Sequence, residues 1–228
     1  MVEDLFGNLS TQVSENTREE ADTDLVVLLR DGEVVESSSL STLKDTLLLV
    51  NSDYYRTGKA DLENLNVPDV ILELSDTVFT LQGYPDSNIE KLVLTLISRY
   101  IEQRAWKHEV GSLCTSFQSL SLSYSERATR EVYRQLGQIP DLTVDVYGAP
   151  DCEPPELPGV TVHETTDDEV HETSDDELEQ YWFVVHRIES ATSAALLAKQ
   201  TGPTEWRGFW TFDTNTVRTL DRYIQRSF

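Results

Sequence analysis

One segment constrains the fold of this chain more than any other, and it runs from Gly83 to Glu109. It reads "GYPDSNIEKLVLTLISRYIEQRAWKHE". Ser87 followed by Glu90 forms a capping box, which predicts that a helix begins there. The polar residues that follow recur at helical spacing and form one stripe, whereas the remaining positions are apolar. A helix with such a wide apolar face is expected to lie at the centre of the fold and to be mostly buried.

The polar stripe on this helix has two interpretations. Its members are Lys91, Thr95, Ser98, Arg99, Glu102 and Gln103. Arg99 and Glu102 are three residues apart, so they can form an ion pair on one helix face. The simpler interpretation is a solvated face. The other is the wall of a ligand pocket, which makes Arg99 a candidate ligand-binding residue.

Strands and helices are predicted to interleave along the rest of the chain. Apolar runs bounded by turn residues predict strands at 25–29, 77–82, 112–124, 142–148, 181–188 and 193–199. The run "LVVLL" is expected to be a buried strand that enters a hairpin at Asp31-Gly32. Capping residues and helical spacing predict further helices that begin at Ser39 or Ser41, at Pro68, at Ser125 and at Asp213.

The pattern of elements predicts an α+β fold, with a mixed or antiparallel sheet flanked by helices in a single domain. Residues 1–23 are expected to be a loose acidic segment, and 24–228 to form the domain. A flexible acidic loop is expected at about 150–180, because "APDCEPPELPG" is rich in proline and "VHETTDDE" is followed by "VHETSDDE". His163 and His171 are eight residues apart in this loop, a spacing with no fixed geometry for a metal.

The charge of the chain excludes several partners. It has 41 acidic and 18 basic residues, a formal net charge of -23, which disfavours binding to nucleic acid or to anionic lipid. The carboxylates are spread along the chain, which favours the solvated surface of a halophilic protein over an acidic interaction tail. No apolar run spans a membrane and no signal peptide is present, so we expect a cytoplasmic protein.

No motif for catalysis is present. The chain lacks the glycine-rich patterns that hold phosphates and the elbow that carries a nucleophilic serine. Its two cysteines, Cys114 and Cys152, form neither a disulfide framework nor a metal pair. Cys114 is expected to be a small buried residue. We predict no catalytic residue, no metal site and no enzymatic activity.

Recognition therefore becomes the expected activity, because three irregular segments lie beside predicted core elements. These are 50–62, 82–88 and the aromatic segment "TEWRGFWTF". They supply, with the polar stripe, the candidate ligand-binding residues Asn51, Tyr54, Tyr84, Arg99 and Trp210. Trp210 and Phe212 share a side if their segment is extended. The sequence leaves open whether these rings stack on a planar ligand or complete the core, and it does not identify a cofactor.

Several blocks in order resemble the DICT sensory domain, in the form found as short separate proteins of halophiles. They are "LLLVNSDYYRTGKADLENLNVPDV", "GYPDSNIEKLVLTLISRYIEQRAW", "FQSLSLSYSERATREVYRQL", "DVYGAPD", "WFVVHR" and "ALLAKQTGPTEWRGFWTFDTNTVRTLDRYI". The resemblance covers about residues 25–226. It implies an α+β fold and a sensory role in systems that contain diguanylate cyclases and two-component proteins, with a suggested link to light. It implies no catalytic residue and no known ligand.

The expected function is that of a stand-alone sensory domain, responsive to light or to a small ligand, which acts on a partner signalling protein such as a kinase, a cyclase or a regulator. One alternative is a regulatory protein-interaction module without a ligand. Another is an enzyme of unknown class. The sequence names neither the stimulus nor the partner nor the oligomeric state.

Overall fold

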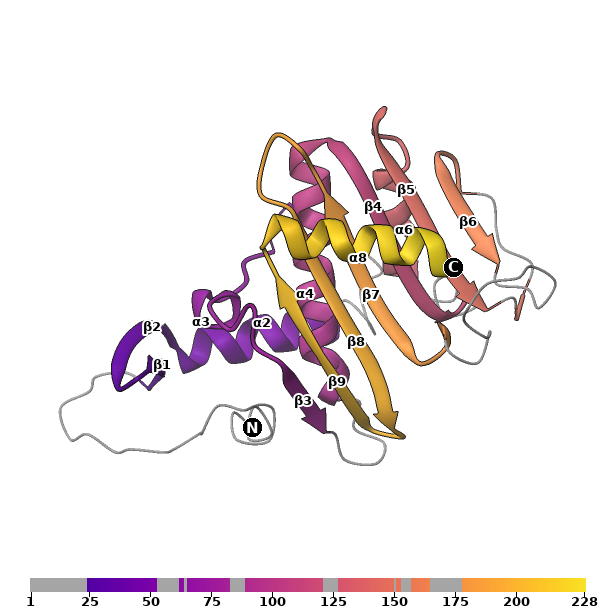
Figure 1. Cartoon of the computed structure of the whole chain (residues 1–228). Coiled ribbons are helices and arrows are strands. Elements are labelled where there is room, and N and C mark those ends of the chain that lie inside the picture. Colours follow the sequence, from indigo (N-terminus) through magenta and orange to yellow (C-terminus); the bar gives the residue numbers. More distant parts are fainter. Residues whose placement is uncertain are drawn as a thin grey trace.

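The fold is described by a computed structural model of the chain (Figure 1). The residues that it describes are 24–52, 62–63, 65–82, 89–120, 127–149, 151–152, 157–164 and 178–228. The expected loose segment 1–23 and most of the doubled acidic repeat lie outside these ranges. No helix within them is long and apolar enough to cross a membrane.

A mixed sheet of seven strands forms the centre of the fold, in the order β3-β9-β8-β7-β4-β5-β6. The strands are β3 (Phe79–Gln82), β4 (Val110–Ser119), β5 (Asp141–Ala149), β6 (Val160–Glu164), β7 (Tyr181–Arg187), β8 (Ala194–Gly202) and β9 (Glu205–Thr211). β4, β5 and β6 pair in parallel, and the other neighbours pair antiparallel. The expected α+β fold with a mixed sheet is confirmed.

Helices cover both faces of this sheet. One face packs against α4 (Ile89–His108), which in turn contacts α2 (Leu40–Ser52) and α6 (Arg127–Leu136), and α3 (Asp69–Leu72) belongs to the same hydrophobic core. The opposite face packs against α8 (Thr214–Ser227). Figure 1 shows α8 crossing the middle strands on one side of the sheet and α4 lying on the other. We call these the α4 face and the α8 face.

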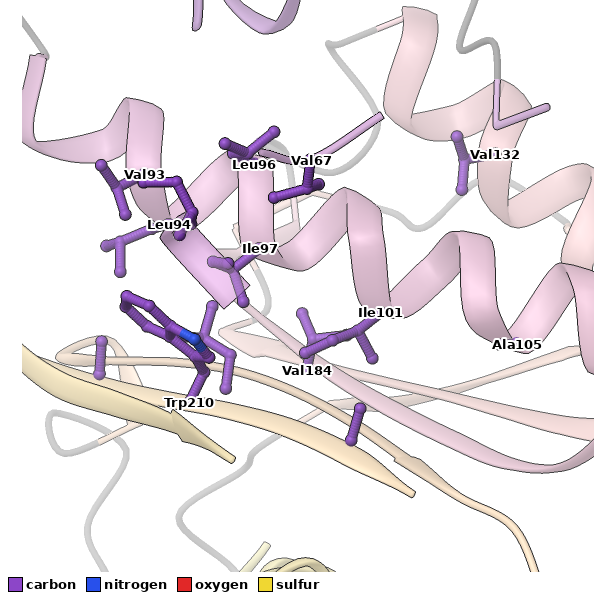
Figure 2. Close-up of a cluster of buried hydrophobic side chains, with 14 of the residues drawn as sticks. Val67, Val93, Leu94, Leu96, Ile97, Ile101, Ala105, Val132, Val184 and Trp210 are labelled. Carbon is purple, nitrogen blue, oxygen red and sulfur yellow. The ribbon is translucent and has the colours of Figure 1, made fainter. Parts of the chain in front are cut away.

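The alternation of side chains along the strands separates two cores. On β7, Trp182 and Val184 point to the α4 face, whereas Phe183 and Val185 point to the α8 face. The larger core lies under α4, where Leu94, Leu96, Ile97 and Ile101 are almost completely buried (Figure 2). The expectation that this helix is central and mostly buried is confirmed.

A separate hairpin of β1 (Leu25–Arg30) and β2 (Glu33–Ser39) precedes the main sheet. Asp31 and Gly32 have φ values of 54° and 86°, as the expected tight turn requires. The prediction that "LVVLL" is a buried strand is wrong, because Leu25 is 56% exposed and Leu29 is 55% exposed. The face of this two-stranded sheet that carries Val26, Leu28 and Val35 packs against the core, and its strands contact α2 and α3.

Two of the predicted helix caps are present. The Thr42 amide donates to Ser39 Oγ at 3.0 Å at the start of α2, so Ser39 is the cap rather than Ser41. The Thr216 amide donates to Asp213 Oδ2 at 2.8 Å at the start of α8. These contacts satisfy amide donors that have no partner within the helix. Ser87, the expected cap of α4, lies outside the described residues.

Candidate functional site

Trp210 occupies the core beneath the N-terminal half of α4. Its side chain is 2% exposed, and its ring centroid lies 5.3 Å from that of Phe79 on β3. Figure 2 shows the indole beneath Val93, Leu94 and Ile97. In this structure Trp210 is a packed core residue, which is one of the two alternatives that the sequence left open for the aromatic segment.

The tryptophans under α4 differ in how their indole N–H groups are paired. Trp182 Nε1 donates to Ser98 Oγ on α4 at 2.9 Å. The buried N–H groups of Trp206 and Trp210 have no acceptor among the residues that the structure describes. An unpaired buried donor costs about 1–3 kcal/mol. A hydrogen-bond acceptor that entered the core beside Trp206 or Trp210 would therefore remove this cost.

Arg99 belongs to a buried polar group that we call the Arg99 cluster, which consists of Arg99, Glu102, Thr115, Thr129 and Tyr133. Arg99 donates to Glu102 Oε2 at 2.6 Å and to Thr129 Oγ1 at 2.7 Å. Tyr133 donates its hydroxyl to Glu102 Oε1 at 2.7 Å. The side chain of Glu102 is 4% exposed and that of Arg99 is 17% exposed. Both oxygens of a buried carboxylate are therefore bound, one by a guanidinium and one by a phenol.

Regular spacing on two helices positions the cluster. Arg99 and Glu102 are three residues apart on α4, and Thr129 and Tyr133 are four residues apart on α6, so each pair lies on one helix face. Thr115 on β4 is 1% exposed; its side chain forms a hydrogen bond with Tyr133, and its Oγ1 lies 3.3 Å from the Phe183 carbonyl on β7. The cluster therefore joins α4, α6 and the central strands.

The prediction that the polar stripe of α4 is a solvated face is wrong. Thr95, Ser98, Glu102 and Gln103 are between 3% and 8% exposed. Their polar atoms have internal partners, as buried polar atoms generally do. Gln103 Nε2, for example, donates to the carbonyls of Leu62 and Leu65 at 2.6 and 3.0 Å. Thr95, Ser98, Glu102 and Gln103 of this stripe are therefore shielded from solvent.

The environment of Tyr133 keeps its hydroxyl protonated. Burial raises the pKa of Tyr133 well above its usual value of 10.0, and the negative charge of Glu102 raises it further. The phenol therefore acts as a hydrogen-bond donor and does not ionise near neutral pH. The Arg99 cluster therefore suits ligand binding rather than proton transfer. Its one carboxylate, that of Glu102, is already paired with the Arg99 guanidinium, and a ligand could replace either partner.

A second polar group lies on the α8 face. Cys114 Sγ lies 3.7 Å from Asp221 Oδ1, and Arg187 Nε lies 2.8 Å from Asp221 Oδ2. Burial raises the pKa of the Cys114 thiol, and the charge of Asp221 raises it further. Because a thiol is nucleophilic only as the thiolate, Cys114 is the small buried residue that the sequence predicted.

His163 lies on β6, so the prediction that it belongs to an irregular loop is wrong. Its ring stacks on Tyr147 with centroids 4.5 Å apart, and its Nε2 lies 2.8 Å from Asp145 Oδ1. Parallel pairing brings His163 and Tyr147 together, because they are register partners on adjacent strands. No group of three His, Cys, Asp or Glu side chains that could hold a metal occurs within the described ranges. His171 lies outside them.

The structure describes the side chains of two of the five predicted ligand-binding residues, Arg99 and Trp210. Arg99 binds Thr129 on α6, whereas Trp210 packs on Phe79 of the edge strand β3, so the two lie on different sides of α4. The side chain of Asn51 is outside the described part of the chain, as are Tyr54 and Tyr84. Sequence reasoning missed Tyr133, although its spacing from Thr129 on an amphipathic helix was a usable signal.

Comparisons with known proteins identify one family. The family model described as "Sensory domain in DIguanylate Cyclases and Two-component system", DICT, matches residues 69–201, which is more than half of the 228 residues. The match includes α4, α6 and every member of the Arg99 cluster. No curated protein matches the chain. No solved structure matches it either.

Proposed function

We propose, because this chain belongs to the family of DICT sensory domains, that it is a sensory and signal-transduction protein in which light or a small ligand acts at the Arg99 cluster. The change is passed to a partner signalling protein, such as a kinase, a cyclase or a regulator. A cytoplasmic location and a halophilic source are parts of the same proposal. They are supported by the net charge of -23 and by the absence of a membrane-spanning helix from the described residues.

The observation that carries the proposal is the burial of an ion pair in the main core. Moving Arg99 and Glu102 out of water costs free energy that their attraction only partly returns, so apolar residues of the same size would stabilise the fold as well or better. Buried ionic groups are best explained where they fix one arrangement of packed elements against another. Here the pair fixes α4 against α6.

The ligand chemistry that suits this site is a carboxylate or another anion. Arg99 presents a planar set of donors that binds carboxylates in two places at once, and its side chain is the more exposed member of the pair. An anion that binds Arg99 competes with Glu102, which leaves Glu102 to Tyr133 alone. Asn51, Tyr54 and Tyr84 are proposed as further ligand contacts, and Trp210 is proposed as a separate contact on the other side of α4.

The structure offers a route for the change to leave the site. Ser98, one residue before Arg99, accepts a hydrogen bond from Trp182 on β7. Strand β7 contacts α4 on one face and α8 on the other. A shift of α4 along its axis would therefore move β7 and alter the contacts between β7 and α8. A ligand moves such an equilibrium only by its difference in affinity for the two states, which competition for Arg99 provides.

The experiment begins with protein purified from its natural source. Its absorbance is recorded above the tryptophan band, and molecules released on denaturation are identified by mass spectrometry. We expect one released molecule with an acidic group or a chromophore. Its occupancy should fall at least about tenfold in Arg99→Gln, since a charge-assisted hydrogen bond contributes about 1.5–3 kcal/mol.

The matched control is Arg130→Gln, which removes an exposed arginine of α6 and should leave the occupancy unchanged. Protein with no absorbance beyond the tryptophan band and no released molecule contradicts this form of the proposal. Equal losses in Arg99→Gln and Arg130→Gln place the ligand elsewhere.

A regulatory interaction module without a ligand is the second candidate, and the hairpin of β1 and β2 favours it. Leu25, Val27, Leu29 and Val34 are between 43% and 66% exposed, which is typical of a protein-binding patch. A pull-down at high salt with Leu29→Ser as the comparison tests this candidate. Retention of the same proteins by the variant contradicts it.

A further inference from the structure

The outer face of α8 carries a row of arginines that is unusual for this chain. Arg218, Arg222 and Arg226 are all exposed and follow one another at intervals of four residues. None of the three forms an ion pair with a carboxylate of the described residues; the one contact of the row is internal, from Arg222 Nε to the Arg218 carbonyl at 3.3 Å. We call these three residues the arginine row.

The helix itself adds no acidic residue to this face. The carboxylate within α8 is that of Asp221, which is 2% exposed and points inward to Arg187. Asp213 precedes the helix and is occupied by the Thr216 amide. The row is therefore a cationic surface on a chain that has 41 acidic and 18 basic residues.

Helix stability does not explain the whole row. A positive charge stabilises a helix through the helix dipole, but only within about the last turn. Arg226 lies in the last turn of α8. Arg218, in contrast, is the fifth residue of a helix of 14 residues, too far from the C-terminus to contribute. Solubility does not explain the arginine row either, because the 41 acidic residues of the chain already keep its surface charged.

The geometry of the row matches a helical partner. Residues four apart on a helix are separated by about 6 Å along its axis and turn by about 40°, so the row spans about 12 Å on one side. Val217, Asp221 and Ile224 are buried on the other side. Tyr223 borders the row and is 53% exposed; tyrosine and arginine are the residue types that most often dominate binding energies at interfaces.

We infer that the arginine row and Tyr223 form the docking surface for an acidic helix of a partner protein, one with carboxylates at four-residue intervals beside an apolar residue. The inference rests on the proposed function in one respect, which is that the signal passes to another protein. Guanidinium groups bind carboxylates in a planar, two-point geometry, and equal spacing on the two helices lets the three pairs form together.

Other anionic partners fit less well. Duplex nucleic acid or a membrane extends beyond a strip of this size and would face the excess of carboxylates on the whole chain. A second copy of this chain lacks the complementary surface, because no helix within the described ranges has a row of three exposed carboxylates at four-residue spacing. The observations favour a slender acidic segment.

The probe is a synthetic alanine-based peptide of about 20 residues, long enough to be partly helical in water, with glutamate at every fourth position and one leucine on the same face. A scrambled peptide of the same composition is the control for net charge. Fluorescence anisotropy measures both affinities in about 0.15 M salt, where the Debye length is about 8 Å. A duplex DNA and phosphatidylserine vesicles are tested in parallel.

The variants are matched in charge. Arg218→Gln, Arg222→Gln and Arg226→Gln are combined in one protein. Arg30→Gln, Arg130→Gln and Arg207→Gln, all exposed elsewhere, are combined in another. The first protein should bind the spaced peptide at least about tenfold more weakly, because three ion pairs of up to about 1 kcal/mol each are lost. The second should stay within about twofold of the unchanged chain.

Each outcome decides the question. Equal binding of the scrambled peptide, or equal losses in the two combined variants, overturns the inference because only overall charge would then matter. Tighter binding of DNA or vesicles overturns it in favour of a phosphate surface. Self-association that sedimentation detects and that the first variant abolishes assigns the row to a second copy. If the first variant does not fold, Arg222→Gln alone should weaken binding about threefold.

The peptide experiment does not depend on the sensory ligand. Failure of the peptide to bind, together with a released ligand whose occupancy needs Arg99, contradicts the docking surface and leaves the proposed function standing. Binding of the peptide by protein that releases no ligand contradicts the Arg99 site and leaves the docking surface standing.

Discussion

Each face of the seven-stranded sheet contains an ion pair between an arginine and a buried carboxylate, and the two pairs differ in their surroundings. On the α4 face Glu102 binds Arg99, and on the α8 face Asp221 binds Arg187; both carboxylate side chains are 4% exposed. Arg99 is 17% exposed, whereas Arg187 is 36% exposed. The α4 pair is thus enclosed by packed elements, and the α8 pair is open to water on its cationic side.

The other hydrogen-bond partners of the two carboxylates differ as well. Glu102 also binds Tyr133 at 2.7 Å, whereas Asp221 has a thiol at 3.7 Å and an amide of Gln225 at 3.4 Å. Short hydrogen bonds to a charge are stronger than long ones or those from sulfur. The comparison indicates that the α4 face fixes the arrangement of elements, while the α8 face tolerates change at its surface.

The largest expected effect comes from removing one charge from each pair. Glu102→Gln leaves the Arg99 guanidinium enclosed without its partner, which should lower the free energy of unfolding by about 3–5 kcal/mol. Asp221→Asn leaves Arg187 where water reaches it, so we expect about 1–2 kcal/mol. Denaturation by urea measures both. Equal losses would show that the two faces do not differ in the way described.

The second effect is a dependence of stability on pH that arises on the α4 face. His186 is completely buried, its Nε2 lies 3.2 Å from the Val110 carbonyl, and its ring stacks on His108 at 6.0 Å. Burial, together with the nearby charges of His108 and Arg104, lowers the pKa of His186 to about 4. The folded protein therefore holds this imidazole neutral.

The direction of the effect follows from this lowered pKa. Above the usual value of 6.5 the histidine is neutral in both the folded and the unfolded state, and the stability is fully present. As the pH falls from 6.5 through 4 the unfolded state binds the proton first, which destabilises the fold by about 3 kcal/mol. His186→Gln should flatten this part of the curve. His108→Gln, the control, should keep most of it, because burial is the largest cause of the lowered pKa.

The burial of α4 could be predicted from its wide apolar face, but the solvation of its polar stripe could not. Periodicity shows which residues share a side of a helix, and it does not show what packs there. Gln103 is covered by the segment around Leu62 and Leu65, which is separated from it by some forty positions. The same limit applies to "LVVLL", since an apolar strand is buried only on the faces that other elements cover.

The candidate site shows the same division. The pairing of Arg99 with Glu102 could be predicted because both lie on one helix. The contacts with Thr129 and Tyr133 could not, because they depend on how α6 packs against α4. The assignment of His163 to a loop failed because its position is set by β5, through pairing with Tyr147, and not by the acidic repeat of which it is the second residue.

A smaller effect is expected at Ser116, on the α8 face where β4 and β7 stop pairing. The Phe183 amide donates to Ser116 Oγ at 2.8 Å, and Ser116 Oγ donates to the Tyr181 carbonyl at 3.2 Å. Ser116→Ala leaves a buried amide unpaired and should cost about 1–3 kcal/mol. Ser37→Ala, at an exposed position of β2, is the control. A change in Ser116→Ala no larger than in the control would contradict this role.

The smallest effect separates two roles of arginine on α8. Arg226→Gln should lower the free energy of unfolding by about 0.5 kcal/mol, because its charge is lost from the last turn, whereas Arg218→Gln should leave stability unchanged. Both should weaken binding of the spaced acidic peptide to a similar degree. Thermal unfolding and anisotropy measure the two quantities. If Arg218→Gln changes stability and not binding, the row supports the helix rather than a partner, and the openness of the α8 face has no part in recognition.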